Sequence, residues 1–129
     1  MGGLPGRACR TGRRGQSGSA TVWTIAMMAL VWLAAVVAVD VGVARAARLR
    51  AETAADLAAL AAAAHALTTS EGACARAHAV TTANGSRVDR CSVVDGITEV
   101  AVSLRFTLPF SGSRTARAVA RAGPIGADE

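Results

Sequence analysis

The hydrophobic and polar positions divide the chain into a long helical part and a shorter part with strand periodicity. A stretch without any charged residue covers residues 16–39, and its apolar part covers residues 20–39. Twenty or so residues make roughly 30 Å of helix, the thickness of a bilayer's hydrocarbon core. The pattern predicts a transmembrane helix, which we assign to residues 19–44. A cleaved secretory signal, whose apolar region is usually shorter, and a buried core helix are the alternatives.

The helical pattern continues beyond this apolar stretch. No proline and no glycine occurs within residues 43–67, and alanine, the strongest helix former, is abundant there. Residues 45–69 are therefore expected to form a helical stalk that continues the membrane helix. A stripe at three- and four-residue steps predicts packing, either against the chain's own C-terminal region or against other long helices. The stripe consists of Gly42, Ala46, Leu49, Thr53, Leu57, Leu60, Ala64 and Leu67.

Asp40 interrupts an apolar run that could otherwise continue to Ala44. If the span ends at Val39, the carboxylate lies at the interface and marks the exit from the membrane. If the span continues to Ala44, Asp40 lies about four residues, roughly 6 Å, inside and needs a partner. Its own helix offers a poor one, because Arg45 is about 140° around the axis. Asp40 is then a candidate for pairing with another subunit, and both interpretations stay open.

Residues 70–123 are predicted to form a small α+β module. Ser70 and Glu71 begin a short helix, which Asn84-Gly85 would end. Alternation of apolar and polar residues then predicts an antiparallel sheet of two to three strands, with an Asp95-Gly96 turn after the first. The strands are expected at residues 87–94, 97–108 and, with a weaker pattern, 114–122.

Two cysteines, Cys74 and Cys91, fall within this module. In a small region with a thin core they predict a disulfide, formed in an oxidising compartment. Closing a loop of about 15 residues contributes about 3 kcal/mol of stability in the chain-entropy model. Free thiols are one alternative. A zinc site with His65 and His78 is another, since Cys74 and His78 share one helical face.

Composition limits the size of the core. The chain has 129 residues, 52% of them hydrophobic but only 3% aromatic, so alanine and valine supply most of the apolar surface. One small domain is expected, and a large self-contained core is not.

The charges give an orientation. The net charge of +5 is carried by arginine alone, because the chain has no lysine. Four arginines lie in a leader, residues 1–18, that is expected to be disordered, and three more closely follow the span. The positive-inside rule mildly favours a cytoplasmic N-terminus, and cysteines in an oxidising compartment agree with an extracytoplasmic C-terminus. Cys9 would then be reduced in the cytoplasm, and residues 124–129 would form a disordered tail.

Candidate chemistry is nearly absent. Neither histidine has a sequence context that hints at a nucleophile, and no Gly-rich phosphate loop follows a strand. The arginines have no aromatic residues between them, which argues against a nucleic-acid site. We therefore expect no catalytic residues, no cofactor, no metal and no small-molecule substrate.

Residues 17–64 resemble the N-terminal region of TadG-like proteins and their TadE relatives, which serve tight-adherence (Flp-type) pilus assembly. The shared features are a small-residue start at Gly18, an apolar helix, an exit through Val39-Asp40-Val41-Gly42 and an Ala-rich block at residues 54–61. The small module with two cysteines looks like the small TadE-like proteins of actinobacteria encoded beside secretion genes. Type IV pilins have a glutamate at the fifth residue after the glycine. Trp23 stands there in this chain, so the uncleaved TadG-like anchor is the better match.

The resemblance implies a non-enzymatic, single-span protein of the cell (inner) membrane. It would be an accessory or minor pilin-like component of a Tad-type pilus or secretion apparatus, with other Tad subunits as partners through the long helix. The alternative is a membrane-anchored extracytoplasmic sensor or regulatory binding module.

Overall fold

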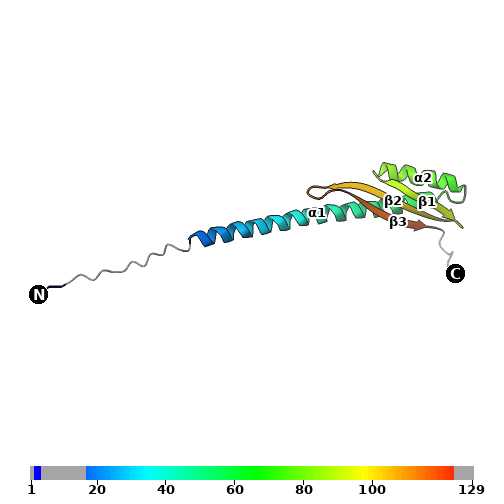
Figure 1. Cartoon of the computed structure of the whole chain (residues 1–129). Coiled ribbons are helices and arrows are strands. Elements are labelled where there is room, and N and C mark those ends of the chain that lie inside the picture. Colours follow the sequence, from blue (N-terminus) through cyan, green and yellow to red (C-terminus); the bar gives the residue numbers. More distant parts are fainter. Residues whose placement is uncertain (1, 4–16, 124–129) are drawn as a thin grey trace, which may run out of the picture. The chain divides into compact units, whose positions relative to one another are not determined.

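The fold is α+β, as the sequence predicts, and is described from a computed structural model over residues 2–3 and 17–123. The described residues form two helices followed by three strands (Figure 1). Cys9 and the predicted tail, residues 124–129, lie outside the described residues, as does most of the predicted leader. The elements are α1 (Ser17–Ala63), α2 (Ser70–Ala83), β1 (Arg87–Val94), β2 (Ile97–Leu108) and β3 (Gly112–Ala122).

The chain divides into two compact units, residues 1–35 and residues 36–129. In the first unit, all side chains described from Gly18 to Ala35 are exposed. α1 is long and apolar enough to cross a membrane, and none of its most apolar window is buried. The Thr24 hydroxyl donates a 2.7 Å hydrogen bond to the Ala20 carbonyl. This threonine is therefore satisfied within its own helix, as a lipid environment requires.

In the second unit, the three strands form an antiparallel sheet in the order β1-β2-β3. Asp95 and Gly96 link the first two strands with φ angles of 51° and 78°. Two successive positive φ angles are what a type I′ hairpin turn requires, so the predicted turn is confirmed. β3 begins at Gly112, two residues before the predicted start, because Ser113 and Arg114 pair with Thr107 and Phe106 of β2.

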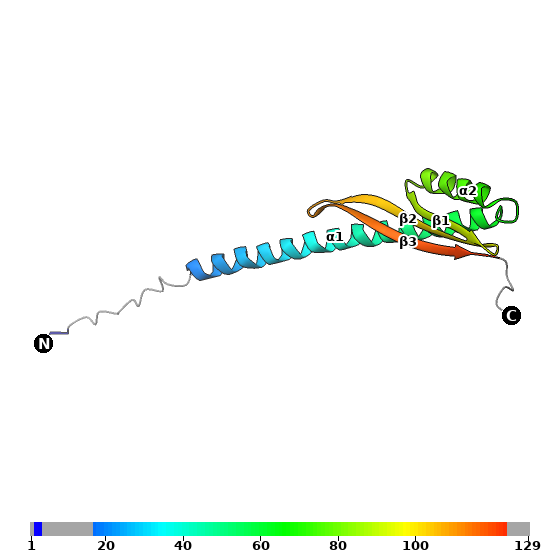
Figure 2. The same ribbon diagram turned by 45° about the vertical axis from the view of Figure 1, so that its right-hand side comes forward.

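Both helices contribute to one core on one face of the sheet (Figure 2). The core contains only small side chains, and Val100 and Val102 are among its largest fully buried members. Alanine allows the backbone of a helix to come close to the strands, at the expense of buried apolar area. The core residues are Ala55, Ala58, Ala59 and Ala62 of α1, Ala73 and Ala77 of α2, and Val88, Val100, Val102 and Ala120 of the sheet.

α1 ends at Ala63, earlier than the predicted stalk, which extended to residue 69. Beyond Ala63 the backbone hydrogen bonds shorten to three-residue steps, as in His65 N–H to Ala62 O at 2.9 Å and Thr68 N–H to His65 O at 3.0 Å. These tight turns reverse the chain so that α2 can begin. The unbroken alanine-rich pattern gave no sign of this reversal.

The ends of α2 are capped by local side chains. Thr69 is the N-cap, and its hydroxyl accepts a 3.1 Å hydrogen bond from the Gly72 N–H. Asn84 is the C-cap, followed by Gly85 with a φ of 69°. A residue with positive φ directly after a helix commonly ends it, and glycine adopts that conformation without strain. The predicted limits of this helix are confirmed.

Candidate functional site

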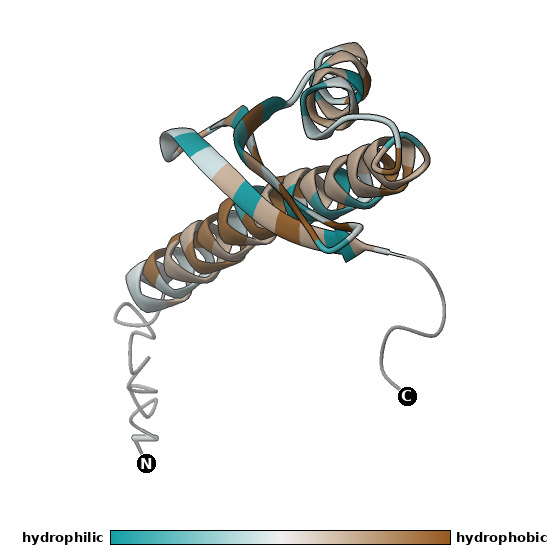
Figure 3. Ribbon diagram, turned by 90° about the vertical axis from the view of Figure 1, so that its right-hand side faces the viewer, coloured by the Kyte–Doolittle hydropathy of each residue, from teal (hydrophilic) through white to brown (hydrophobic). Residues whose placement is uncertain are grey.

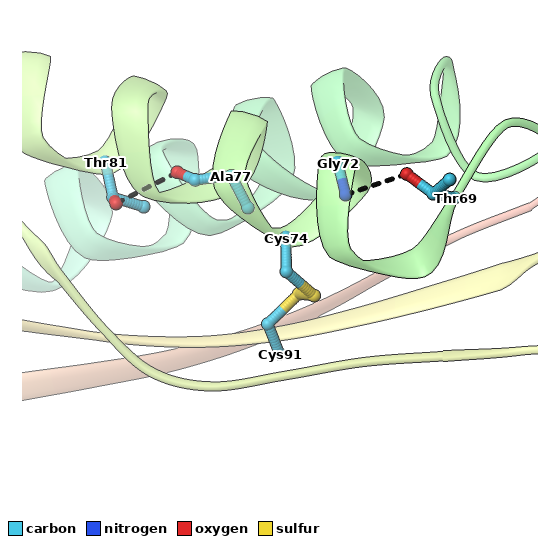
Figure 4. The surroundings of a disulfide bond; sticks show 6 residues. All are labelled: Thr69, Gly72, Cys74, Ala77, Thr81 and Cys91. Atoms are coloured by element: carbon cyan, nitrogen blue, oxygen red, sulfur yellow. Dashed lines mark hydrogen bonds between the residues drawn. A yellow bond between two sulfur atoms is a disulfide. The ribbon is translucent and has the colours of Figure 1, made fainter.

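The predicted disulfide is confirmed: Cys74 of α2 is bonded to Cys91 of β1, with the two Cα atoms 5.9 Å apart (Figure 4). The link fastens α2 to the sheet beside the alanine and valine core. Cys91 itself packs against that core and is half-buried.

A β-bulge in β1 directs Cys91 toward α2. Val88 pairs with Val102, but Arg90 pairs with Ala101, so Asp89 is an extra residue in the register. On a regular strand, Val88 and Cys91 would point to opposite faces, because they are three residues apart. The extra residue restores both to the inner face. The disulfide therefore depends on an irregularity that the sequence analysis did not predict.

The alternative zinc site does not form in this structure, because both cysteine sulfurs are bonded to each other. Among the described residues, no group of three or more His, Cys, Asp or Glu side chains could hold a metal ion. His65 and His78 are both exposed, and Nδ1 of His65 lies 3.1 Å from the Ala61 carbonyl oxygen.

Asp40 is contacted by the turn between β2 and β3. The Ser111 hydroxyl donates a hydrogen bond to Asp40 Oδ2, and the Phe110 N–H donates a longer one of 3.4 Å to Asp40 Oδ1. Asp40 as a whole is half-buried. Sequence reasoning considered only helix neighbours and another subunit as partners, so it missed this one. The pairing of Asp40 with another subunit stays a prediction.

The predicted packing stripe is exposed. The side chains of Leu49 and Leu60 are 63% and 62% exposed, and Leu57 is 45% exposed. Gly42 and Ala46, also on α1, are exposed as well. Ala64 and Leu67 lie beyond the end of α1, in the turn, so the stripe on the helix itself ends at Leu60.

The chain's own module packs on a different face of α1. With 3.6 residues per turn, Leu60 lies about 200° around the helix from both Ala58 and Ala62, which are fully buried. Leu49 has the same relation to the buried Ala47 and Ala51. In Figure 3, where the ribbon is coloured by hydropathy, hydrophobic residues occur along the length of α1. The stripe residues are therefore not part of the core that α1 shares with the chain's C-terminal region, and their packing against other long helices stays a prediction.

Charged side chains lie beside the stripe on α1. Arg48 and Glu52 form an ion pair of 2.9 Å one turn apart, and both are substantially exposed. Such a pair contributes only a few tenths of a kcal/mol to the helix, about 0.3–0.5 kcal/mol. Its main effect is to give α1 a polar face between the buried alanines and the exposed leucines.

The open face of the sheet carries a shallow polar groove of about 450 Å³. Asp89 lies within it, where Oδ1 accepts a 2.7 Å hydrogen bond from the Ser103 hydroxyl and Oδ2 lies 4.0 Å from Arg117 Nε. Arg87 and Arg105 also line the groove, so positive charge exceeds negative charge there. Such a surface can bind an anionic group.

These elements are consistent with a single-pass membrane protein: an apolar helix able to span a bilayer, continued into a small disulfide-linked α+β module. Residues 18–65 match the family described as "Putative Flp pilus-assembly TadE/G-like". Over α1 the chain is thus similar to this family, in agreement with the resemblance of its small-residue start and its exit through Asp40. The match covers about a third of the chain and does not include the sheet. No curated protein and no solved structure matches the chain.

Proposed function

We propose that the chain is a non-enzymatic, single-span accessory or minor pilin-like component of a Tad-type pilus or secretion apparatus. The observation that carries the proposal is the TadE/G-like match, which falls on the helix able to span a membrane. The family is associated with Flp pilus assembly. The α+β module, with its alanine and valine core and its disulfide, would serve as the part of the chain outside the membrane.

The exposed stripe on α1 is the proposed assembly surface. Leu49, Leu57 and Leu60 are held on a helix whose other side is already covered by the chain's own sheet. Gly42 extends the same stripe toward the membrane, and a side chain added there would meet no atom within 4 Å. Small residues and leucines in one row let a second long helix approach closely. A long apolar helix of another Tad subunit is therefore the partner we expect.

The proposed orientation places the N-terminus in the cytoplasm and the module outside. Two features support it: the arginines of the leader, by the positive-inside rule, and the Cys74–Cys91 bond, which persists in an oxidising compartment. A phosphatase fused after Glu129 and active only outside the cytoplasm should be active. An inactive but stable fusion would contradict this orientation.

The function itself is tested by purifying the tagged, membrane-extracted protein and identifying what accompanies it. Recovery of a Tad-type pilin, platform protein or secretion ATPase supports the proposal. A protein that is inserted and stable but brings none of these subunits with it contradicts the proposal.

The groove on the open face of the sheet favours the second candidate, an extracytoplasmic sensor or regulatory binding module. Arg87, Arg105 and Arg117 are aimed at the same groove and could hold an anionic ligand. Replacing Arg105 with Ala would impair signalling in that case, without changing which subunits co-purify. An assembly component would tolerate the same replacement.

A further inference from the structure

The turn between β2 and β3 is fixed at the level where the apolar part of α1 ends. Asp40 is the first charged residue after the uncharged residues 16–39. Ser111 and Phe110 of the turn both donate hydrogen bonds to its carboxylate. If residues 20–39 cross the hydrocarbon core, this contact places the turn beside the membrane surface and not far out in the aqueous phase.

The chemistry of the turn suits that position. No charged residue occurs within residues 106–113, and Phe110 is 57% exposed at the tip of the hairpin. Phenylalanine is among the apolar side chains that surface-bound elements bury at the boundary between headgroups and acyl chains.

Arginines flank this uncharged tip on both strands, and another follows Asp40 on α1. Arg105 and Arg114 flank it on β2 and β3. Arg45 follows Asp40 by five residues, or about 7.5 Å along the helix. Cationic side chains just outside an apolar segment are attracted to anionic lipid headgroups. An apolar tip with arginines behind it is therefore complementary to a bilayer surface.

We propose that the tip of the β2–β3 hairpin, residues 109–111, inserts among the lipid headgroups, and that Asp40 holds it there. The inference rests on the proposed function, because it requires α1 to span the membrane. It gives Asp40 a role within its own chain: the carboxylate at the membrane exit accepts hydrogen bonds from a hairpin that contacts the same bilayer surface. The module then has two contacts with the membrane, α1 and the hairpin tip.

The test uses the full chain with Cys9→Ser and Phe110→Cys, so that residue 110 carries the free thiol while Cys74 and Cys91 remain bonded. An environment-sensitive fluorophore on this thiol is measured in phosphatidylcholine–phosphatidylglycerol vesicles containing lipids with a nitroxide near the headgroup. The control carries the same fluorophore at Val94→Cys, an exposed apolar position beside the β1–β2 turn. We expect several-fold stronger quenching at residue 110 than at residue 94, and a loss of that difference when Asp40→Ala is added.

The two tryptophans of the chain, Trp23 and Trp32, both lie in the apolar segment and report on the span separately. In the unlabelled protein, lipids with a nitroxide deep in the acyl chain should quench them. Quenched tryptophans with equal, weak quenching at residues 110 and 94 would overturn the hairpin contact and leave the span intact. Unquenched tryptophans would overturn the span, and the hairpin contact with it. Strong quenching at residue 110 that survives Asp40→Ala would overturn the role of Asp40.

Discussion

The hydroxyl of Ser111 donates a hydrogen bond to the carboxylate of Asp40, 71 residues earlier in the chain. The contact joins the turn between β2 and β3 to the point where α1 loses its apolar character. A carboxylate near the hydrocarbon is costly unless it is hydrogen bonded, and this one is bonded from within its own chain. Asp40 therefore does not need another subunit to be satisfied.

Two substitutions separate the internal role of Asp40 from pairing with another subunit. Ser111→Ala removes the hydroxyl donor and leaves the charge of Asp40 in place. We expect it to lower the free energy of local opening of the hairpin by about 1 kcal/mol. Amide exchange in the hairpin should then be about fivefold faster. Asp40→Asn, which removes the charge but keeps the size, should have a similar effect on the hairpin. Both proteins should insert and co-purify with their partners normally. Loss of partners with Asp40→Asn, but not with Ser111→Ala, would instead establish inter-subunit pairing.

Removing the disulfide should weaken the outer module. Cys74→Ser is expected to lower the free energy of unfolding of the module by about 3 kcal/mol, because it removes a loop constraint on the unfolded chain. The small alanine and valine core can compensate for little of this loss. Protease resistance of the module in membranes measures the loss. Cys74 and Cys91 should resist alkylation until reductant is added, while Cys9 should react throughout in permeabilised cells. A Cys74→Ser protein with wild-type protease resistance would refute the structural role of the bond.

Thr98 provides a test of the core. Its side chain is fully buried, and its hydroxyl has no hydrogen-bond partner among the described residues. Thr98→Val keeps the shape and removes the desolvation penalty, so the module should gain about 1 kcal/mol, seen as a higher urea midpoint. Thr81→Val is the matched control, because the Thr81 hydroxyl is equally buried but bonded to the Ala77 carbonyl at 3.0 Å. A control that gains more stability than Thr98→Val would contradict this account.

The chain should not be processed after Gly18. Trp23 occupies the position at which type IV pilins have a glutamate, so no carboxylate is available to pair with a new amino terminus. In addition, α1 begins at Ser17, which places the Gly18–Ser19 bond inside the helix. Intact-mass and N-terminal peptide analysis of the membrane form should therefore find no chain that begins at Ser19. Detection of Ser19 as the mature N-terminus would refute the uncleaved anchor.

Features set by neighbouring residues could be predicted from the sequence. The limits of α2 follow from Glu71 in its first turn and from Asn84-Gly85 after its last. The Asp95-Gly96 turn sets the end of β1 and the start of β2. Each of these signals acts over a few residues. The disulfide partners also followed, because the module contains only two cysteines.

Features set by distant contacts could not be predicted. The bulge at Asp89 has no local signal, and the Asp40 contact depends on a turn 71 residues away. Which face of α1 the sheet covers could not be predicted either. Leucine buries more apolar area than alanine, so a leucine stripe is the expected core face, but here Ala58 is buried and Leu60 is exposed. Because alanine occurs on every side of this helix, its periodicity alone could not identify the covered face.

The exposed leucines give the most direct test of the proposed assembly role. The double variant Leu57→Ala and Leu60→Ala keeps good helix formers and truncates two side chains that are 45% and 62% exposed and do not belong to the module's core. Two leucines buried by a partner helix would each contribute about 1.5–3 kcal/mol to the free energy of binding. Their truncation should therefore lower partner recovery at least tenfold. The control, Val119→Ala, truncates an apolar residue on the open face of the sheet that is 63% exposed, as Leu60 is at 62%. Quantitative co-purification should show partner loss for the leucine variant alone, at unchanged membrane levels. Wild-type recovery of Tad subunits with the leucine variant would contradict the account.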